Sequence, residues 1–484
     1  MYRIKLHLSY LITVVKSLLF ISSLLCATSW AGEVEEFVTT LKAHYQDTLS
    51  IKKYSLNYHF YNKQYRARNY WDYEIPNRVL SVRMVEVDTV NKHFYDNDIL
   101  YGPGGEILDR AQFQNDTHSY YYERNGNYLG KRYFNEGLEN FDRFMGYHRM
   151  NIDFLAIRPL LTEPNIKRAI SLRKTDDSVI LSHKNSADQL VDYEFLQGSL
   201  QLVKIHNVTR KAVYIYSDYQ TTRGITFARS VNKYYNGESV PAYISFNDKF
   251  ALIDQVDASK LKLPAGYGPE ILPSDGVLVA KELTNNLYLV TDSGAWRNGM
   301  FKVHGDNITV FGAAGNSTFA EKTIKLIKTQ FPNKTISGIY VTHPQARDIA
   351  GLNVYADKGI KVIADQYTIE GIKAFPGFAN DINAFKFQPI ENKQVINGVK
   401  YYVLESLHAK RQSFAFFENE NIIFQADFMR IAFDNTIPKV IPSYTKAFIN
   451  FIRQENLPVN RIVGNYQNNN ISIDVVNKVY QAML

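Results

Sequence analysis

One stretch of eleven residues, 342–352, constrains this chain more than any other part of it. It reads Thr-His-Pro-Gln-Ala-Arg-Asp-Ile-Ala-Gly-Leu and follows the apolar run 336–341, which is typical of a β-strand. A histidine, a glutamine, an arginine and an aspartate therefore stand together just after a strand. Arg347 is the unusual member, because a guanidinium has five donors, no acceptor and a permanent positive charge. It cannot bind a metal ion, and it repels one nearby.

The stretch resembles the signature of the metallo-β-lactamase-fold superfamily, Thr-His-x-His-x-Asp-His-x-Gly-Gly, which also follows a strand. That resemblance implies a hydrolytic site in which imidazoles and carboxylates hold one or two ions and leave a position for water. In this register His343 stands at the first histidine, Gln345 at the second, Arg347 at the aspartate, Asp348 at the third histidine, and Ala350 with Gly351 at the glycine pair. The motif is degenerate, since its register is kept while most of its ligands are changed.

Three later positions also match the family, each just after an apolar run. His408 stands at the fourth histidine, although it could equally be an ordinary loop residue. Asp427 stands at the aspartate that bridges the two ions. Its alternative role is to cap the N-terminus of a following helix. Asn465 replaces the last histidine, and its amide suits hydrogen bonding better than zinc coordination.

The resemblance divides these residues between two ion sites. The first would use His343, Gln345 and His408, the second Arg347, Asp348 and Asn465, and both would share Asp427. His343, His408 and Asp427 could hold a single zinc ion and form the catalytic set, while the set that contains Arg347 cannot hold a second ion. Gln345, Arg347, Asp348 and Asn465 are then expected to act in binding.

Arg347 has two possible orientations. If its side chain points inward, the guanidinium would lie near Asp427 and perhaps near Asp348, or would bind an anionic ligand. In the alternative orientation it turns to solvent.

The expected fold class is α+β, with an N-terminal curved antiparallel β domain followed by a four-layer αββα sandwich similar to that of the metallo-β-lactamases. Residues 32–256 form the first domain, a Pro/Gly-rich segment at 257–274 the linker, and 275–484 the second domain. The tyrosine-rich strands of the first domain weakly resemble the outer-membrane lipoprotein carrier and sorting domains, which implies a lipid-like ligand. A substrate-shaping or dimerisation domain is the alternative, and a small-molecule ligand is possible as well.

Hydrophobic periodicity predicts the individual elements of the second domain. The expected strands are 277–280, 287–290, 298–303, 307–311, 336–341, 360–364, 401–404, 413–417, 422–425 and 461–463, and the expected helices are 317–330, 348–358 and 444–455. In the first domain, Asn125-Gly126 predicts a tight hairpin between 120–122 and 128–134.

Residues 1–31 are typical of a secretory signal peptide, with basic residues at the start, the apolar stretch 17–27 and small residues before position 32. The apolar stretch is too short to span a bilayer, so no transmembrane segment is expected in the mature chain. Cys26 is the only cysteine, and an exported chain without disulfides fits a bacterial periplasm. Loss of the three signal cations lowers the net charge from +7 to +4, and the absence of a basic run gives no reason to expect a nucleic-acid partner.

Two functions of different classes fit the sequence. One is a non-catalytic or altered-function protein that binds a ligand or acts as a scaffold. The other is a mononuclear metal-dependent hydrolase of an ester, lactone or related substrate, in which the ion lowers the pKa of a bound water. A metal-free acid–base pair of His408 and Asp427 is a third possibility.

We predict that export removes residues 1–31, because the segment has the three parts that a signal peptidase recognises. The intact mass of protein recovered from the periplasm of a bacterial host should correspond to a chain that begins at Gly32. Recovery of the full-length mass, or of a lipid adduct on Cys26, would contradict the prediction.

Overall fold

The computed structural model describes residues 32–63, 78–162, 169–235, 237–294 and 296–484, and the predicted signal segment lies outside them. Contacts divide the chain into two compact units. Unit 1 holds the residues up to Phe60 together with Asp142–Asp254, and unit 2 holds Tyr61–Phe141 together with Gln255–Leu484. Segment 61–141 thus groups with the C-terminal half. The expected boundary at 257–274 concerns independent folding, and it stays a prediction.

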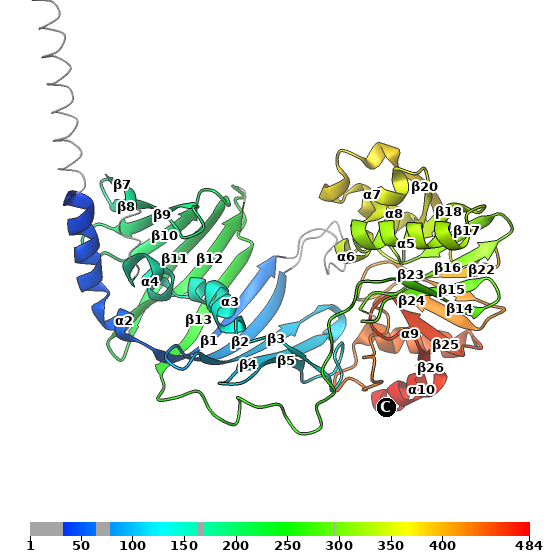
Figure 1. Cartoon of the computed structure of the whole chain (residues 1–484), viewed down its shortest axis with the longest axis horizontal. Coiled ribbons are helices and arrows are strands. Elements are labelled where there is room, and N and C mark those ends of the chain that lie inside the picture. Colours follow the sequence, from blue (N-terminus) through cyan, green and yellow to red (C-terminus); the bar gives the residue numbers. More distant parts are fainter. Residues whose placement is uncertain (1–31, 64–77, 163–168, 236, 295) are drawn as a thin grey trace, which may run out of the picture. The chain divides into compact units, whose positions relative to one another are not determined.

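Unit 1 is a run of antiparallel strands with helices beside it (Figure 1). The strands follow the order β1-β13-β12-β11-β10-β9-β8-β7. Their bounds are β1 (Lys53–Lys63), β7 (Ala169–Lys174), β8 (Ser178–Lys184), β9 (Leu190–Leu196), β10 (Leu202–Asn207), β11 (Ala212–Thr222), β12 (Ile225–Tyr235) and β13 (Tyr243–Leu252). The helices are 32–44, α2 (Gln46–Ser50), α3 (Asn140–His148), η2 (Arg149–Asn151) and α4 (Asp153–Thr162).

The helical face of this sheet is aromatic. Along β9 the buried residues Val191, Tyr193 and Phe195 alternate with more exposed ones, which places one face of the strand against the core. The ring of Phe154, on α4, packs edge-on against Phe250 of β13, with ring centroids 5.6 Å apart. Helix α4 therefore covers the sheet.

Unit 2 begins with a meander of neighbouring antiparallel strands, β2 to β6. Their bounds are β2 (Arg78–Asp88), β3 (His93–Tyr101), β4 (Ile107–Gln114), β5 (Ser119–Glu123) and β6 (Tyr133–Asn135), with η1 (Pro103–Gly105) before β4. The hairpin expected around Asn125-Gly126 is present, since β5 pairs antiparallel with β6, but the expected tight turn is wrong, because a wide loop joins the two strands. Glu123 accepts the backbone N–H groups of Tyr128 and Leu129 at 2.7 and 3.0 Å, which holds this loop open.

The remainder of unit 2 contains two mixed sheets. The first has the order β14-β15-β16-β17-β18-β19-β20 and the second the order β21-β22-β23-β24-β25-β26. The strands are β14 (Val279–Thr284), β15 (Leu287–Thr291), β16 (Gly299–His304), β17 (Asn307–Phe311), β18 (Thr335–Tyr340), β19 (Lys361–Asp365), β20 (Lys386–Ile390), β21 (Gln394–Ile396), β22 (Val399–Leu404), β23 (Gln412–Phe417), β24 (Ile422–Gln425), β25 (Arg461–Gly464) and β26 (Ile471–Ser472). The strands expected from periodicity in this region are confirmed, except that the one expected at 277–280 is shifted and forms β14 at Val279–Thr284.

The helices of this part are α5 (Ser317–Gln330), α6 (Ala346–Ile349), α7 (Leu352–Ala356), α8 (Gln366–Lys373), α9 (Ser443–Gln454) and α10 (Ile473–Met483), with the short turns η4 (Pro376–Phe378) and η5 (Ile382–Ala384). The expected helices 317–330 and 444–455 agree with α5 and α9. Among the described residues, no helix is both long enough and apolar enough to cross a bilayer.

The two sheets share one apolar core. Phe311 of the first sheet meets Phe417 of the second with ring centroids 5.0 Å apart, and Tyr340 meets Tyr401 at the same distance. On its other face the first sheet packs against α5, and the second sheet packs against α9 and α10. Neighbouring residues of one strand consequently enter different cores, as Ile339 and Tyr340 do on β18.

The helix expected over 348–358 is broken into α6 and α7 at Gly351. A Cβ at this residue would lie 2.4 Å from the carbonyl oxygen of Asn316, so only glycine fits there. The backbone N–H of Gly351 also donates to the carbonyl of Ala314 at 2.8 Å. This close approach turns the chain after α6 and confines Arg347 and Asp348 to a single short turn.

Asp153, at the start of α4, makes the stability of unit 1 depend on pH. Its carboxylate is buried and accepts the backbone N–H of Ala228 at 2.9 Å, and burial raises its pKa to about 7. A carboxyl whose pKa is higher in the folded state binds its proton more tightly there. The resulting stabilisation is present at low pH and is lost as the pH rises from about 4 to about 7, and it amounts to about 4 kcal/mol.

We predict that Asp153→Asn abolishes the loss of stability with rising pH, because asparagine keeps an acceptor for the backbone N–H of Ala228 and cannot ionise. Denaturant unfolding at pH 5 and pH 8 should show a smaller difference for the variant than for the parent. Asp188→Asn, at an exposed position, is the matched control and should leave the difference unchanged. Equal pH dependence in the parent and the Asp153 variant would refute the prediction.

Candidate functional site

The seven residues singled out from the sequence lie where strands of both sheets end. His343 follows β18, Gln345 precedes α6, and Arg347 and Asp348 lie on α6. His408 lies between β22 and β23, Asp427 follows β24, and Asn465 follows β25. Hydrogen bonds and ion pairs connect all of them, so the structure brings the complete set together.

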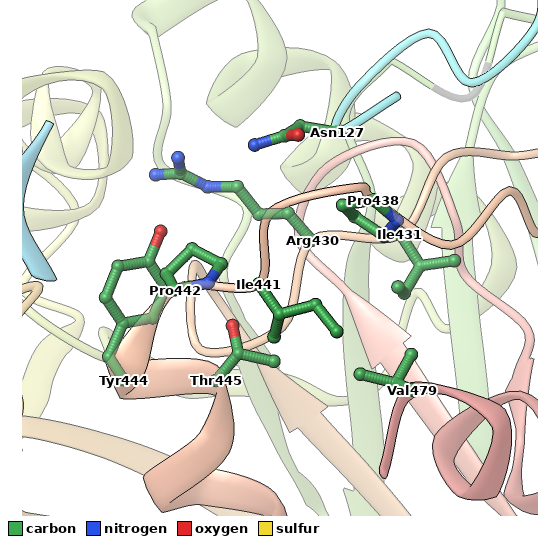
Figure 2. Close-up of a pocket in the computed structure, with 9 residues that line it drawn as sticks. All are labelled: Asn127, Arg430, Ile431, Pro438, Ile441, Pro442, Tyr444, Thr445 and Val479. Carbon is green, nitrogen blue, oxygen red and sulfur yellow. The ribbon is translucent and has the colours of Figure 1, made fainter. Parts of the chain in front are cut away.

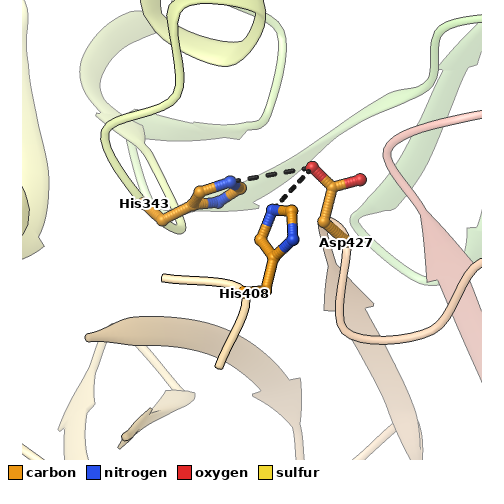
Figure 3. Close-up of side chains that lie close together, drawn as sticks. All are labelled: His343, His408 and Asp427. Carbon is orange, nitrogen blue, oxygen red and sulfur yellow. Dashed lines mark ion pairs between the residues drawn. The ribbon is translucent and has the colours of Figure 1, made fainter. Parts of the chain in front are cut away.

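His343, His408 and Asp427 form the centre of the site (Figure 3). The carboxylate oxygen Oδ2 of Asp427 lies 3.6 Å from Nε2 of His343 and 3.4 Å from Nε2 of His408. One potential ligand atom from each residue lies within 4.8 Å of the other two, and all three side chains are buried. Burial lowers the pKa of His343 to about 4, so its ring is neutral at pH 7 and its nitrogen is available as a ligand.

Asp427 carries a buried negative charge that two arginines compensate. Arg347 donates from Nη2 to its Oδ2 at 2.9 Å, and Arg430 donates from Nε to its Oδ1 at 2.8 Å. Burial by itself raises the pKa of a carboxyl, but the Arg347 charge and the bond with His408 hold the pKa of Asp427 below its usual range. The backbone of Asp427 adopts a φ of +64°, a left-handed conformation that aspartate tolerates better than most residues.

Arg347 points inward, as one of its two expected orientations requires. Besides Asp427, its Nε donates to Oε1 of Gln345 at 2.7 Å, and Nη2 lies 3.4 Å from the hydroxyl of Tyr128. The guanidinium also stacks on the ring of Tyr466, 4.7 Å from the ring centroid. With 31% of its side chain exposed, Arg347 is the part of this charge network that reaches towards solvent.

Asp348 is held by three donors on one oxygen. Its Oδ1 accepts from Asn465 Nδ2 at 2.8 Å, from the Tyr466 hydroxyl at 2.6 Å and from Arg297 Nη1 at 3.3 Å. Its Oδ2 has no hydrogen-bond partner among the described residues and lies 3.7 Å from Nε2 of His343. Asn465 thus acts through hydrogen bonding, the role for which its amide is suited.

Five residues of the site were missed from the sequence: Glu106, Tyr128, Arg297, Arg430 and Tyr466. Glu106 pairs with Nη1 of Arg430. The hydroxyl of Tyr128 contacts Arg347, and the guanidinium of Arg430 lies over the Tyr128 ring. Both come from the meander of unit 2, more than two hundred positions before their partners. Arg430 and Tyr466 could have been suspected from their places three residues after Asp427 and directly after Asn465.

The packing around Arg430 is close. A cavity next to it is lined by Asn127, Arg430, Ile431, Pro438, Ile441, Pro442, Tyr444, Thr445 and Val479 (Figure 2). A neighbouring cavity touches Tyr128, Asp427 and Tyr466. Each has a volume of about 10 Å³, which is the space of a single water molecule.

The donor atoms fit one divalent ion. Two imidazole nitrogens and a carboxylate oxygen are typical zinc ligands, and Nε2 of His343 is buried without a hydrogen-bond partner among the described residues. Within the part of the chain that the structure describes, this is the one such group of converging His, Asp, Glu or Cys donors. Arg347, which stands beside it, brings a positive charge to the neighbouring polar groups.

No protein-family model matches this chain, and no curated protein sequence matches it. Solved metallo-β-lactamases match parts of it at 13% identity. One from Hirschia baltica covers 42% of this chain and 97% of its own with a TM-score of 0.33, and FIM-1 from Pseudomonas aeruginosa, in its mono-zinc form, covers 43% and 96% with a TM-score of 0.34. These values are too low to support an inference about family or activity.

We predict that Arg347→Ala destabilises unit 2 by about 3 kcal/mol, because Asp427 then loses one of its two compensating charges in a buried position. Equilibrium unfolding in denaturant at pH 7 measures the change. In an Asp427→Asn background the same substitution should cost less than about 1 kcal/mol.

Arg173→Ala serves as the matched control, since Arg173 also pairs with an aspartate but has 59% of its side chain exposed. Its cost should stay within about 0.5 kcal/mol. An Arg347→Ala protein as stable as its parent would show that the Arg347–Asp427 pair does not stabilise unit 2.

Proposed function

We propose that this protein is an exported binding or scaffold protein with a metallo-β-lactamase-like C-terminal part, in which Arg347 replaces the second metal ion. The observation that carries the proposal is the 2.9 Å bond from Arg347 Nη2 to Asp427 Oδ2. The resemblance assigns these two positions to ligands of the second ion, and here their charges compensate each other. The helix–sheet–sheet–helix packing of unit 2 supports the four-layer likeness.

A guanidinium gives such a site the properties of a binding site. It supplies fixed donors for a carboxylate or phosphate group, and it needs no cofactor to do so. Arg347 has the most exposed charged side chain of the network, 31% against 18% for Arg297, and would be the first charge to meet such a ligand. The ligand would be a small molecule or, if the sheet of unit 1 serves the lipid-related role that its pattern suggests, a lipid-like molecule.

A second candidate function is a mononuclear metal-dependent hydrolase. The observation that favours it is the convergence of His343, His408 and Asp427, whose potential ligand atoms lie within 4.8 Å of one another. These residues would hold one zinc ion, which when bound supplies Lewis acidity. The candidate substrates are esters, lactones and chemically related compounds.

Metal analysis and hydrolysis assays of the purified mature protein separate the two functions. For the binding protein we expect at most one zinc per chain and only background turnover of ester, lactone, thioester, β-lactam, phosphodiester and sulfate ester substrates. Zinc-dependent turnover that His343→Ala abolishes would establish the hydrolase instead. Two zinc ions per chain would refute the replacement of the second ion by Arg347.

A second ion should bind once Arg347 is replaced and the missing ligands are supplied. Combining Gln345→His, Arg347→Asp, Asp348→His and Asn465→His supplies imidazole and carboxylate ligands and removes the opposing charge. This variant should bind more zinc per chain than the parent, as measured by elemental analysis after dialysis. The variant with the three histidines but with Arg347 retained is the control, and its zinc content should not exceed one ion per chain.

A further inference from the structure

One loop of the meander covers the charge network of the site. Residues 124–132, which join β5 to β6 and are here called the strap, contact the segment 434–440 of the C-terminal half. The backbone N–H of Lys131 donates to Oδ2 of Asp434 at 2.8 Å. Near the other end, Asn125 accepts two backbone N–H groups of that segment at 2.9 and 3.0 Å. Both ends of the strap are therefore held against the same segment.

The middle of the strap places Tyr128 on the two arginines that compensate Asp427. Its hydroxyl lies 3.5 Å from Nη1 and 3.4 Å from Nη2 of Arg347, so it faces the pair of donors at the end of the guanidinium. The side of the same group, Nε with Nη2, donates to Gln345 and Asp427. The guanidinium of Arg430 lies over the Tyr128 ring, 5.1 Å from its centroid. The strap thus occupies the end of Arg347, and the acceptors of the site occupy its side.

The pair of donors at the end of Arg347 suits an oxyanion better than it suits Tyr128. Two parallel N–H bonds to a carboxylate or phosphate group are the strong mode of binding by arginine. Tyr128 offers one oxygen, at distances beyond the usual range of about 2.7–3.2 Å. Burial raises the pKa of this hydroxyl well above its usual value, so it carries no negative charge at pH 7. An anionic ligand is therefore the stronger acceptor and competes with Tyr128 for these donors.

The contacts that shape the strap are separate from those that hold it on the site. Glu123 of β5 accepts the backbone N–H groups of Tyr128 and Leu129, and this support lies within the meander. The bond from Lys131 to Asp434 is exposed to solvent. Water replaces such a bond at a small net cost in free energy. The strap can therefore leave the site without losing its internal support.

The centre of the site is closed while the strap is in place. His343 and His408 are each only 2% exposed, and the side chain of Asp427 is fully buried. Asn127 of the strap lines both small cavities beside Arg430, the first of which Figure 2 shows, and each has room for a single water molecule. A larger ligand therefore reaches this centre only after the strap has moved.

We propose that residues 124–132 are an autoinhibitory strap, which keeps the site closed until an oxyanion displaces Tyr128 from Arg347. The proposal rests on the proposed function, since it takes Arg347 as the group that binds the ligand. A ligand that binds only the open site has its apparent affinity lowered by the fraction of molecules that are open. The strap therefore controls both the strength of ligand binding and the access of solutes to the histidines.

Access to the histidines measures closure without any ligand. The mature full-length protein, freed of metal with a chelator, is treated with diethyl pyrocarbonate, and peptide mass spectrometry follows the carbethoxylation of each histidine. Asp434→Ala removes the acceptor of Lys131. The two site histidines should then react at least threefold faster relative to the exposed His44. Asp381→Ala, at an exposed aspartate whose side chain makes no cap bond to η5, is the matched control and should leave both rates unchanged.

Binding of inorganic phosphate measures the competition. Calorimetric titration should give at least threefold tighter binding for Tyr128→Phe than for the parent, because the ring stays beside Arg430 while the oxygen that faces Arg347 is lost. Asp434→Ala should give a similar gain, because it loosens the strap. Adding Arg347→Lys to Tyr128→Phe should remove the gain, since lysine keeps the charge but lacks the paired donors.

A second variant loosens the strap if Asp434→Ala does not fold, as judged by circular dichroism. A Cβ at Gly130 would lie 2.1 Å from Oδ1 of Asp434, so Gly130→Ala pushes the two segments apart. It should raise the histidine reactivity and the phosphate affinity in the same way.

The outcomes keep the strap and the proposed function apart. Unchanged histidine reactivity in a folded Asp434→Ala or Gly130→Ala protein overturns the strap. Phosphate binding of equal strength in the parent and in Tyr128→Phe also overturns it, since the hydroxyl then competes with nothing. If no variant binds phosphate while the histidines become more reactive, closure by the strap stands and the oxyanion site of the proposed function falls. Faster modification together with tighter binding that depends on Arg347 supports both.

Discussion

The carboxylate of Asp427 is fully buried, and the rest of the site depends on how its charge is compensated. A buried ion is tolerated only when partners replace the water that it has lost. Arg347 and Arg430 are those partners, and each needs support of its own. Gln345 and Tyr128 hold the first, and Glu106 holds the second. A single buried charge thereby fixes side chains from the meander, from α6 and from the loop after β24.

Under the proposed function, arginine and a second metal ion are alternatives at one place. Three guanidinium groups, those of Arg297, Arg347 and Arg430, face three carboxylates, those of Asp348, Asp427 and Glu106, and the formal charges cancel while His343 is neutral. The remaining capacity for a cation lies on the histidine side, where nitrogen atoms and one carboxylate oxygen have no hydrogen-bond partner within the described parts of the chain. Binding of an anionic ligand by the Arg347 guanidinium and binding of one metal ion by the histidines are thus compatible with the same charge balance.

The sequence predicted the parts of this arrangement that are encoded locally. Periodicity located α5, α9 and the strands of both sheets, because each element buries one face at a regular spacing. The register of the motif left two orientations open for Arg347, and in the structure its side chain has the inward one, in which it meets Asp427. Glu106 and Tyr128 were beyond reach, since their role depends on a contact between distant segments. The break at Gly351 was missed because it arises from the carbonyl of Asn316, which local periodicity does not contain.

The mutual dependence of Arg347 and Asp427 also bears on how such a site can change over generations. A single exchange of Arg347 for aspartate would place three acidic side chains, at 347, 348 and 427, around the imidazole of His343, which is neutral at pH 7. Exchange of Asp427 first would leave two guanidinium groups facing each other without their shared acceptor. Either exchange alone leaves buried charges uncompensated and lowers stability. Binding of a second ion would improve only after several further exchanges. A two-ion centre at this place would therefore require several exchanges at once, because no single exchange at Arg347 or Asp427 keeps the buried charges compensated.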